Sequence, residues 1–189
     1  MDCRGLEETE AVALGRKHLS KAAAKNIFML TYDRMRRYEG TWHIEKKPLF
    51  PSYVFLESEN ETLLGEEFGK FQFYMFHSKD SKDREIINGN KGLLRLNRSA
   101  EGLLKSLYGG GYHIKMSKGI IQDGFPRIVA GPLRGMEQRI RRIDRHRRIA
   151  ELALTEGRNL SGGKKEEREN QQPNFGYITA GLEITKKNM

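Results

Sequence analysis

Ile128-Val129-Ala130-Gly131-Pro132-Leu133-Arg134-Gly135-Met136-Glu137 stands at the centre of the C-terminal half of the chain. Apolar residues lead into a Gly-Pro pair, a second glycine follows soon after, and apolar residues resume at Met136. This order predicts a strand over 125–130, a turn at Gly131-Pro132 and another strand over 136–143. The stretch therefore indicates β-structure in this half of the chain.

Two further strands are predicted beyond a charged turn over 144–147. Apolar residues alternate along 149–154 and again along 178–184. Several short strands so close together are typical of a small barrel, and the regular alternation predicts a stable one. Residues 156–175 are poor in hydrophobic side chains and rich in Gly, Lys, Glu, Asn and Gln, so we expect them to form an inserted flexible surface loop.

A mixed pattern of helices and strands precedes the barrel. Helices are predicted over 7–24, 61–68 and 99–108, strands over 27–31, 53–57 and 71–76, a long hairpin or loop over 32–47, and a polar loop over 77–92. Asn60 is expected to cap the second helix, and Gly109-Gly110-Gly111 to end the third. The prediction is an α+β domain over 1–109, a linker over 110–118 and a barrel over 119–189.

The composition favours a folded, basic protein. The chain has 189 residues, of which 37% are hydrophobic and 31% charged, with a net charge of +9. Residues 1–109 hold 18 basic and 16 acidic side chains, a net of +2, whereas residues 110–189 hold 16 basic and 9 acidic, a net of +7. A positive excess on one part of a chain indicates a polyanionic partner, most often nucleic acid.

The excess is concentrated in one arginine-rich segment, and two further cations precede it. We predict that the RNA-binding residues are Lys118, Arg127, Arg134, Arg139, Arg141, Arg142, Arg145, His146, Arg147 and Arg148. The alternative is a solvated basic face without a specific partner. The abundance of arginine over lysine favours recognition, because a guanidinium group binds phosphates and base edges in a bidentate manner.

Several classes of protein are not favoured by the sequence. Its longest apolar runs, such as Tyr53-Val54-Phe55-Leu56, are far shorter than the roughly 20 residues of a membrane-spanning helix. The acidic start of the chain does not resemble a secretory signal, and a single cysteine, Cys3, excludes an internal disulfide framework. We therefore expect a cytoplasmic protein without a membrane partner.

The sequence also carries no motif of a known catalytic or cofactor site. It has no GxxxxGK[ST] loop, no GxGxxG fingerprint and no GxSxG elbow. The five histidines lack zinc-ligand spacing, and His77 is expected to be a polar strand end rather than a base. Cys3 has no histidine beside it and is not expected to be a nucleophile. The prediction is a protein without enzyme activity, cofactor or metal.

Two segments together carry a family resemblance. Lys46-Lys47-Pro48-Leu49-Phe50-Pro51-Ser52-Tyr53-Val54-Phe55-Leu56 resembles the signature of the NusG N-terminal (NGN) domain, and residues 128–137 with Ile140, Ile143 and Asp144 resemble a KOW motif. Their order and spacing are similar to those of the NusG/RfaH family of transcription elongation factors. The segment after Asp144 and the closing residues 179–184 are most similar to the LoaP-type antiterminators of that family.

The resemblance implies a fold and a mechanism. It implies a ferredoxin-like NGN domain, an antiparallel sheet with flanking helices, followed by an SH3-like KOW barrel. The NGN domain would bind the clamp helices of RNA polymerase, and the barrel would bind a structured leader RNA, so that terminators are read through. A ribosomal protein or Rho is a further candidate partner of the barrel, and a monomer is expected. The resemblance assigns polymerase binding to Phe50, Pro51, Tyr53 and Phe55, and we add Trp42 to this set.

The sequence departs from the family pattern at three places. The first, aromatic-rich strand is missing or truncated, so either the natural protein begins upstream or the domain is compromised. Gln138 stands where a glycine is usual, and a positive φ there would be strained. The segment 156–175 splits the last two barrel strands. The alternative function is a KOW-type RNA- or ribosome-binding protein that does not act on polymerase.

Overall fold

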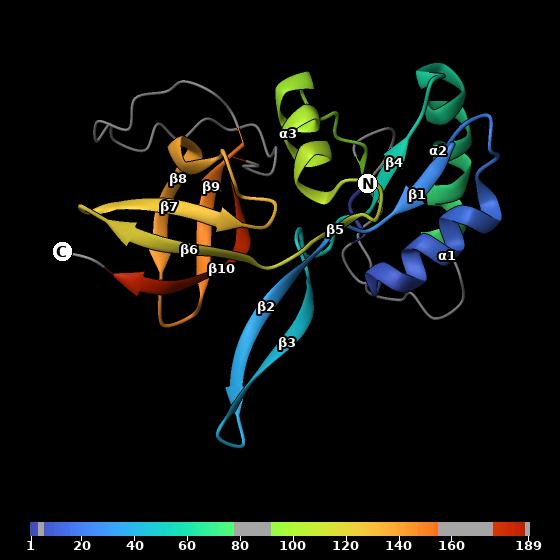
Figure 1. The fold of residues 1–189 in the computed structure, drawn as a ribbon. Coiled ribbons are helices and arrows are strands. Elements are labelled where there is room, and N and C mark those ends of the chain that lie inside the picture. Colours follow the sequence, from blue (N-terminus) through green and yellow to red (C-terminus); the bar gives the residue numbers. More distant parts are fainter. Residues whose placement is uncertain (4–5, 78–91, 155–175, 188–189) are drawn as a thin grey trace, which may run out of the picture. The chain divides into compact units, whose positions relative to one another are not determined.

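A computed structural model of the chain describes residues 1–3, 6–77, 92–154 and 176–187 (Figure 1). Within these ranges the fold is mixed α+β, with three α-helices and three sheets, one of which curls into a half-barrel. The predicted α+β class is confirmed. None of the helices in these ranges is long and apolar enough to cross a membrane.

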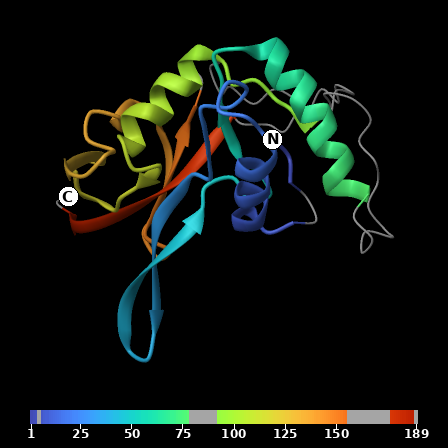
Figure 2. The same cartoon turned by 90° about the vertical axis from the view of Figure 1, so that its right-hand side faces the viewer.

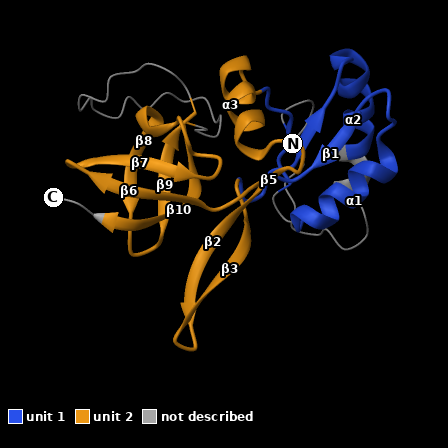
Figure 3. Cartoon of the chain, viewed as in Figure 1, with its two compact units in different colours: residues 1–30, 50–95 blue, residues 31–49, 96–189 orange. Residues whose placement is uncertain are grey.

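The chain forms two compact units (Figure 3). Unit 1 consists of Met1–Leu30 and Phe50–Arg95, and unit 2 of Thr31–Leu49 and Leu96–Met189. The chain therefore passes from unit 1 to unit 2, back to unit 1, and again to unit 2. None of the points at which the chain passes between the units falls at the predicted domain boundaries, 109 and 119. The division into domains over 1–109 and 119–189 therefore stays a prediction.

Unit 1 is built from two helices and a two-stranded sheet. Helix α1 (Glu8–His18) precedes β1 (Asn26–Phe28), which pairs antiparallel with β4 (Phe55–Glu57), and α2 (Glu61–His77) follows. Gly15 is buried in α1, and a side chain there would press against Ile27, so glycine lets the helix approach β1 closely. The sequence predicted this helix over 7–24, but it ends at His18, because the backbone becomes extended at Leu19.

The first residues of the chain run beside the segment that leads into β4. The Met1 amino group donates a hydrogen bond to the Val54 carbonyl at 2.7 Å, and the Cys3 N–H donates to the Ser52 carbonyl at 2.9 Å. Asp2 forms an isolated antiparallel bridge with Tyr53. Residues 1–3 therefore contribute a short extended segment to unit 1, in the region where the sequence predicted a missing or truncated first strand.

Helix α2 corrects one prediction. The sequence indicated a helix over 61–68 and a strand over 71–76, but a single helix covers both. Leu64, Phe68 and Phe71 are spaced four and three apart and continue one helical stripe, with Phe68 and Phe71 buried in the core of unit 1. The alternation after Phe71 was wrongly interpreted as a strand because short apolar runs fit both periods.

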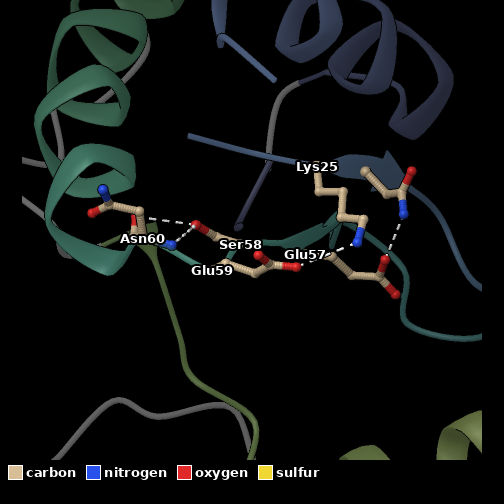
Figure 4. A network of polar contacts seen from close by, with 6 residues as sticks. Lys25, Glu57, Ser58, Glu59 and Asn60 are labelled. Carbon is tan, nitrogen blue, oxygen red and sulfur yellow. Dashed lines mark hydrogen bonds and ion pairs between the residues drawn. The ribbon is translucent and has the colours of Figure 1, made fainter. Parts of the chain in front are cut away.

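The start of α2 is fixed by polar contacts (Figure 4). As predicted, Asn60 caps the helix: its Oδ1 accepts a hydrogen bond from the Leu63 N–H at 3.0 Å. Glu57 accepts from the Asn26 side chain at 2.6 Å, and Glu59 pairs with Lys25 at 3.3 Å. The last two contacts join the end of β4 to Lys25 and to Asn26, the first residue of β1.

Unit 2 begins with a long β-hairpin, visible in Figures 1 and 2 as a two-stranded ribbon whose turn extends beyond the barrel strands. Strand β2 (Thr31–Tyr38) pairs antiparallel with β3 (Thr41–Pro48). Glu39 and Gly40 both have positive φ, 51° and 78°, as a two-residue hairpin turn requires. The sequence predicted either a long hairpin or a loop over 32–47, and the hairpin is confirmed.

Helix α3 (Arg98–Tyr108) and a short strand, β5 (His113–Ile114), follow in unit 2. Leu103, Leu104 and Leu107 form its buried stripe, Asn97 caps it, and Gly109 ends it with a φ of 56°. The predicted third helix is confirmed. Strand β5 pairs in parallel with the start of β2.

The C-terminal half-barrel contains five strands: β6 (Ser117–Gln122), β7 (Phe125–Ala130), β8 (Ile140–Asp144), β9 (Ile149–Ala153) and β10 (Tyr177–Lys187). Their order in the sheet is β7-β6-β10-β9-β8, and only the β10–β6 pair is parallel. The strands predicted over 125–130, 149–154 and 178–184 are confirmed. Two segments were predicted to be loops, 77–92 and 156–175. The second lies outside the described residues, as does the first except for residues 77 and 92.

Two predictions in this half need correction. Strand β6 was not predicted, and it begins inside the predicted linker, since Ser117 is already part of the sheet and fully buried. The strand predicted over 136–143 starts only at Ile140, because Glu137–Arg139 form a turn of 3-10 helix. Glu137 uses its carboxylate to accept the Ile128 N–H at 3.1 Å, which draws this turn against β7.

Two glycines shape the loop between β7 and this 3-10 turn. Gly131 and Gly135 have φ values of 96° and 81°, whereas Gln138 lies in the 3-10 turn and is not among the residues with positive φ. The strain expected at Gln138 is therefore absent. A Cβ on Gly131 would lie 2.6 Å from Ser117 Cα, while one on Gly135 would meet no atom within 4 Å.

This difference predicts unequal effects of two alanine substitutions. Gly135→Ala carries only the backbone cost of a left-handed residue, about 1 kcal/mol, whereas Gly131→Ala adds a clash with β6 and is expected to cost about 3 kcal/mol. Urea unfolding of both variants measures the two losses. Equal losses would show that the close approach of Gly131 to Ser117 does not matter for stability.

Candidate nucleic-acid interface

The turn between β8 and β9 presents three exposed cationic or titratable side chains, Arg145, His146 and Arg147. Asp144 organises the turn by accepting the Arg147 backbone N–H at 2.9 Å. Its carboxylate also lies 3.8 Å from the Arg147 guanidinium. The backbone N–H of Arg147, helped by the charge of that guanidinium, lowers the pKa of Asp144. The turn is therefore a defined loop with cations on its outside.

Arg148, the next residue, has a different role. It has a positive φ of 53°, and its side chain is only 22% exposed. The guanidinium lies over the Trp42 ring, 3.8 Å from the centroid, forms an ion pair with Glu183 and contacts the Met35 sulfur at 3.3 Å. It thus joins the hairpin to β10 within unit 2, although the sequence grouped it with the RNA-binding arginines.

Strand β8 carries the next arginines. A bulge between Ile140 and Arg142 leaves Arg141 as the extra residue, and its guanidinium lies 4.0 Å from the centroid of the Tyr177 ring. Arg142 is exposed and stands opposite Glu151 on β9. Arg139, in the 3-10 turn, is half-buried. Arg141 and Arg142 therefore extend the cationic surface of the β8–β9 turn.

Of the three other predicted RNA-binding residues, two lie on strands at the other end of the sheet order and the third in the loop after β7. Lys118 is on β6, Arg127 on β7 and Arg134 in the loop after Gly131, and all three are exposed. Strands β10 and β9 separate β6 and β7 from β8 in the sheet order. The predicted residues on strands thus fall on two separate parts of the sheet, and the Arg148 side chain is turned toward Trp42 and Glu183.

The aromatic segment predicted to bind polymerase lies in unit 1, except for Trp42. Phe50 is buried, Pro51 is exposed, and Tyr53 and Phe55 are half-buried. The Phe55 ring stacks on Phe28 with centroids 5.8 Å apart and meets Phe50 at 5.4 Å. Trp42 lies on the hairpin of unit 2, so the predicted set is divided between the two units.

Val54 settles which face of this segment is the core. It is 1% exposed and belongs to the core of unit 1, against which Leu56 packs. Tyr53 and Phe55 point to the other face. Ser52, just before them, has a φ of 65°, and its N–H donates to the Glu8 carboxylate at 2.7 Å, which fixes the bend ahead of Tyr53.

Other chemistry in the described residues is limited. Burial raises the pKa of the Cys3 thiol to about 11, so the thiol is protonated at neutral pH. Among residues 1–3, 6–77, 92–154 and 176–187, no three His, Cys, Asp or Glu side chains come together as a metal site. No family model and no curated protein matches the chain.

Sequence reasoning missed several exposed apolar residues of unit 2. Ile44 on β3 is 58% exposed, and Phe125 and Val129 on the edge strand β7 are 76% and 47% exposed. The alternation of Trp42, Ile44 and Lys46 was the available signal for Ile44, because residues two apart in a strand share a face. No feature of the neighbouring sequence distinguishes Phe125 from a core residue.

A pH titration tests the geometry of the basic turn. Since the pKa of Asp144 is lowered in the folded protein, its stabilising contribution is present at neutral pH and is lost as the pH falls through that lowered pKa. The Arg147 amide resonance in NMR spectra should follow this titration, with a midpoint below that of an ordinary aspartate. Asp144→Asn should abolish the inflection, and a midpoint at or above the ordinary value would contradict the contact.

Proposed function

We propose that the protein is a transcription elongation and antitermination factor of the NusG/RfaH type, most similar to the LoaP group. In this proposal residues 1–109 act as an NGN-type domain and residues 119–189 as a KOW-type barrel. The first would bind the clamp helices of RNA polymerase and suppress pausing. The second would bind a structured leader RNA and so promote readthrough of terminators.

The observation that carries the proposal is the basic β8–β9 turn. Arg145, His146 and Arg147 are exposed together on a loop that Asp144 holds in shape, and Arg141 and Arg142 continue the charge along β8. Cations at the end of two strands can contact successive phosphates of an RNA helix, which proteins recognise mainly through backbone and shape. The net charge of +7 over residues 110–189 supports a polyanionic partner for the same part of the chain.

Support for the polymerase contact comes from Tyr53, Pro51 and the neighbouring phenylalanines. Tyr53 and Phe55 lie on the face of their segment opposite the Val54 core, and Pro51 is exposed beside them. Aromatic side chains that retain exposed surface on a fixed backbone are common anchors of protein interfaces. The Ser52 bend and the Asp2–Tyr53 bridge hold this backbone.

A second candidate function is RNA or ribosome binding without polymerase. Phe50 is 8% exposed, and the rings of Phe28, Phe50 and Phe55 are packed together, so part of the aromatic signature serves the packing of the protein itself. The aromatic residues of this segment are therefore partly explained without a polymerase contact. This packing leaves the argument for RNA binding unchanged.

The RNA contact is tested by Arg145→Ala combined with Arg147→Ala. Binding of a stem-loop RNA should weaken, and the slope of log K against log salt should fall by about 1.5, because two phosphate contacts are lost. Lys17→Ala with Lys21→Ala removes the same charge from exposed positions of unit 1 and serves as the control. If both double variants change the slope equally, binding depends on net charge alone.

The polymerase contact is tested by Pro51→Ala combined with Tyr53→Ala. Phe50 is left intact because its removal would open the packing around Phe28 and Phe55. A tagged protein should capture core polymerase from RNase-treated lysate, and the variant should capture about tenfold less, as expected for a lost aromatic anchor. Glu59→Ala with Thr62→Ala, both exposed in unit 1, is the control. Unchanged capture by the Pro51/Tyr53 variant would favour the second candidate function.

A further inference from the structure

The two faces of the β2–β3 hairpin differ in chemistry. Cross-strand pairs place Asp33 with Lys46, Met35 with Ile44, and Arg37 with Trp42 on one face, which we call the Trp42 face. The opposite face carries Arg34 with Glu45 and Arg36 with His43. Directly opposed residues of an antiparallel pair lie on the same side of the ribbon, so the register alone defines these faces.

Trp42 is held in place but only partly covered. The Arg148 guanidinium lies 3.8 Å from the centroid of its ring, and that guanidinium is itself fixed by its ion pair with Glu183. Trp42 nevertheless remains 37% exposed, and Ile44 beside it is 58% exposed. An aromatic ring immobilised in this way can stack on a nucleobase with little loss of conformational freedom.

The charges of the Trp42 face favour an anion. Arg37 and Lys46 are exposed on it. Its one carboxylate, Asp33, is occupied: it accepts the Met116 backbone N–H at 2.9 Å and lies 2.8 Å from His113 Nε2. The other carboxylate of the two strands, Glu45, is on the opposite face, 3.9 Å from Arg36 and 3.3 Å from Lys47.

The Trp42 face is connected to the basic turn of the barrel through Arg148. Arg148, whose guanidinium covers one side of Trp42, follows directly after the exposed Arg145, His146 and Arg147. Hairpin and barrel belong to the same compact unit. Arg148 therefore links the end of the basic turn to Trp42 within this unit.

We infer that the Trp42 face binds single-stranded RNA, with a base stacked on Trp42 and phosphates bound by Arg37 and Lys46. The inference rests on the proposed function, because it extends the RNA surface of the barrel onto the hairpin. It also reassigns Trp42, which the sequence had suggested for polymerase. Base stacking combined with backbone cations is how proteins hold single strands without reading their sequence.

The experiment uses the intrinsic fluorescence of Trp42, the single tryptophan of the chain. The full-length protein is titrated with oligouridylate, with a fully paired RNA duplex and with oligodeoxythymidylate. Oligouridylate should quench the fluorescence, because a stacked base changes the environment of the indole directly, while the duplex should quench it little. Equal quenching by the duplex, or tighter binding of the DNA strand, would overturn the assignment to single-stranded RNA.

Variants separate stacking from charge. Trp42→Leu should weaken oligouridylate binding about tenfold, and Trp42→Phe should restore most of the affinity. Arg37→Gln should weaken binding about threefold and reduce its salt dependence, whereas Arg36→Gln, on the same strand but the opposite face, should not. Arg37 is exposed, so its variant tests the face even if Trp42→Leu fails to fold.

Two further outcomes distinguish this inference from the proposed function. If Arg145→Ala with Arg147→Ala abolishes RNA binding while both the Trp42→Leu and Arg37→Gln variants bind normally, the inference is wrong and the proposed function stands. If the unmodified protein binds neither oligouridylate nor stem-loop RNA, both are wrong. Loss of polymerase capture by Trp42→Leu with unchanged RNA affinity would return Trp42 to a protein interface and overturn the inference.

Discussion

The close approach of Gly131 to Ser117 is the constraint on which the half-barrel depends. Ser117 is fully buried, and its hydroxyl accepts the Leu133 N–H at 3.1 Å, so the loop after β7 is bound to the start of β6. Leu133 is thereby held in the core with no exposed surface. Only a residue without a Cβ, at a φ of 96°, lets the two backbones come this near. The position of this loop in turn determines where the following 3-10 turn and β8 begin.

The sequence predicted four of the five strands of the half-barrel, because these strands alternate clearly and are separated by glycine and charged turns. It failed where one pattern fits two periods, as in the residues after Phe71, which continue α2. It also missed β6, because Ser117, the buried first residue of this strand, is polar and gives no apolar signal for a strand start. Chain order alone could not show that Thr31–Leu49 joins the barrel unit, because that association depends on contacts distant in sequence, such as Asp33 with Met116.

The same limits apply to the candidate site. Composition located the basic segment over Arg134–Arg148, and the exposed turn at its end carries the expected charges. Composition could not separate Arg147, which is exposed, from Arg148, whose backbone turns its side chain toward Trp42 and Glu183. Likewise the aromatic segment gave no sign that Phe50 would be buried while Tyr53 kept part of its surface. Residue type suggests a partner, but only the backbone direction decides which side chains are available to it.

The central place of β10 has a consequence for synthesis on the ribosome. Strands β6 and β7 form one hairpin and β8 and β9 another, and β10 lies between the two hairpins in the sheet. Because the chain emerges from its N-terminus, both hairpins leave the ribosome before Tyr177–Lys187 can join them. Until then the edge of each hairpin that β10 later covers remains open to other strands. The half-barrel is therefore completed only after β10 has been synthesised, and in nascent chains that stop before β10 the two β-edges that it covers stay unpaired.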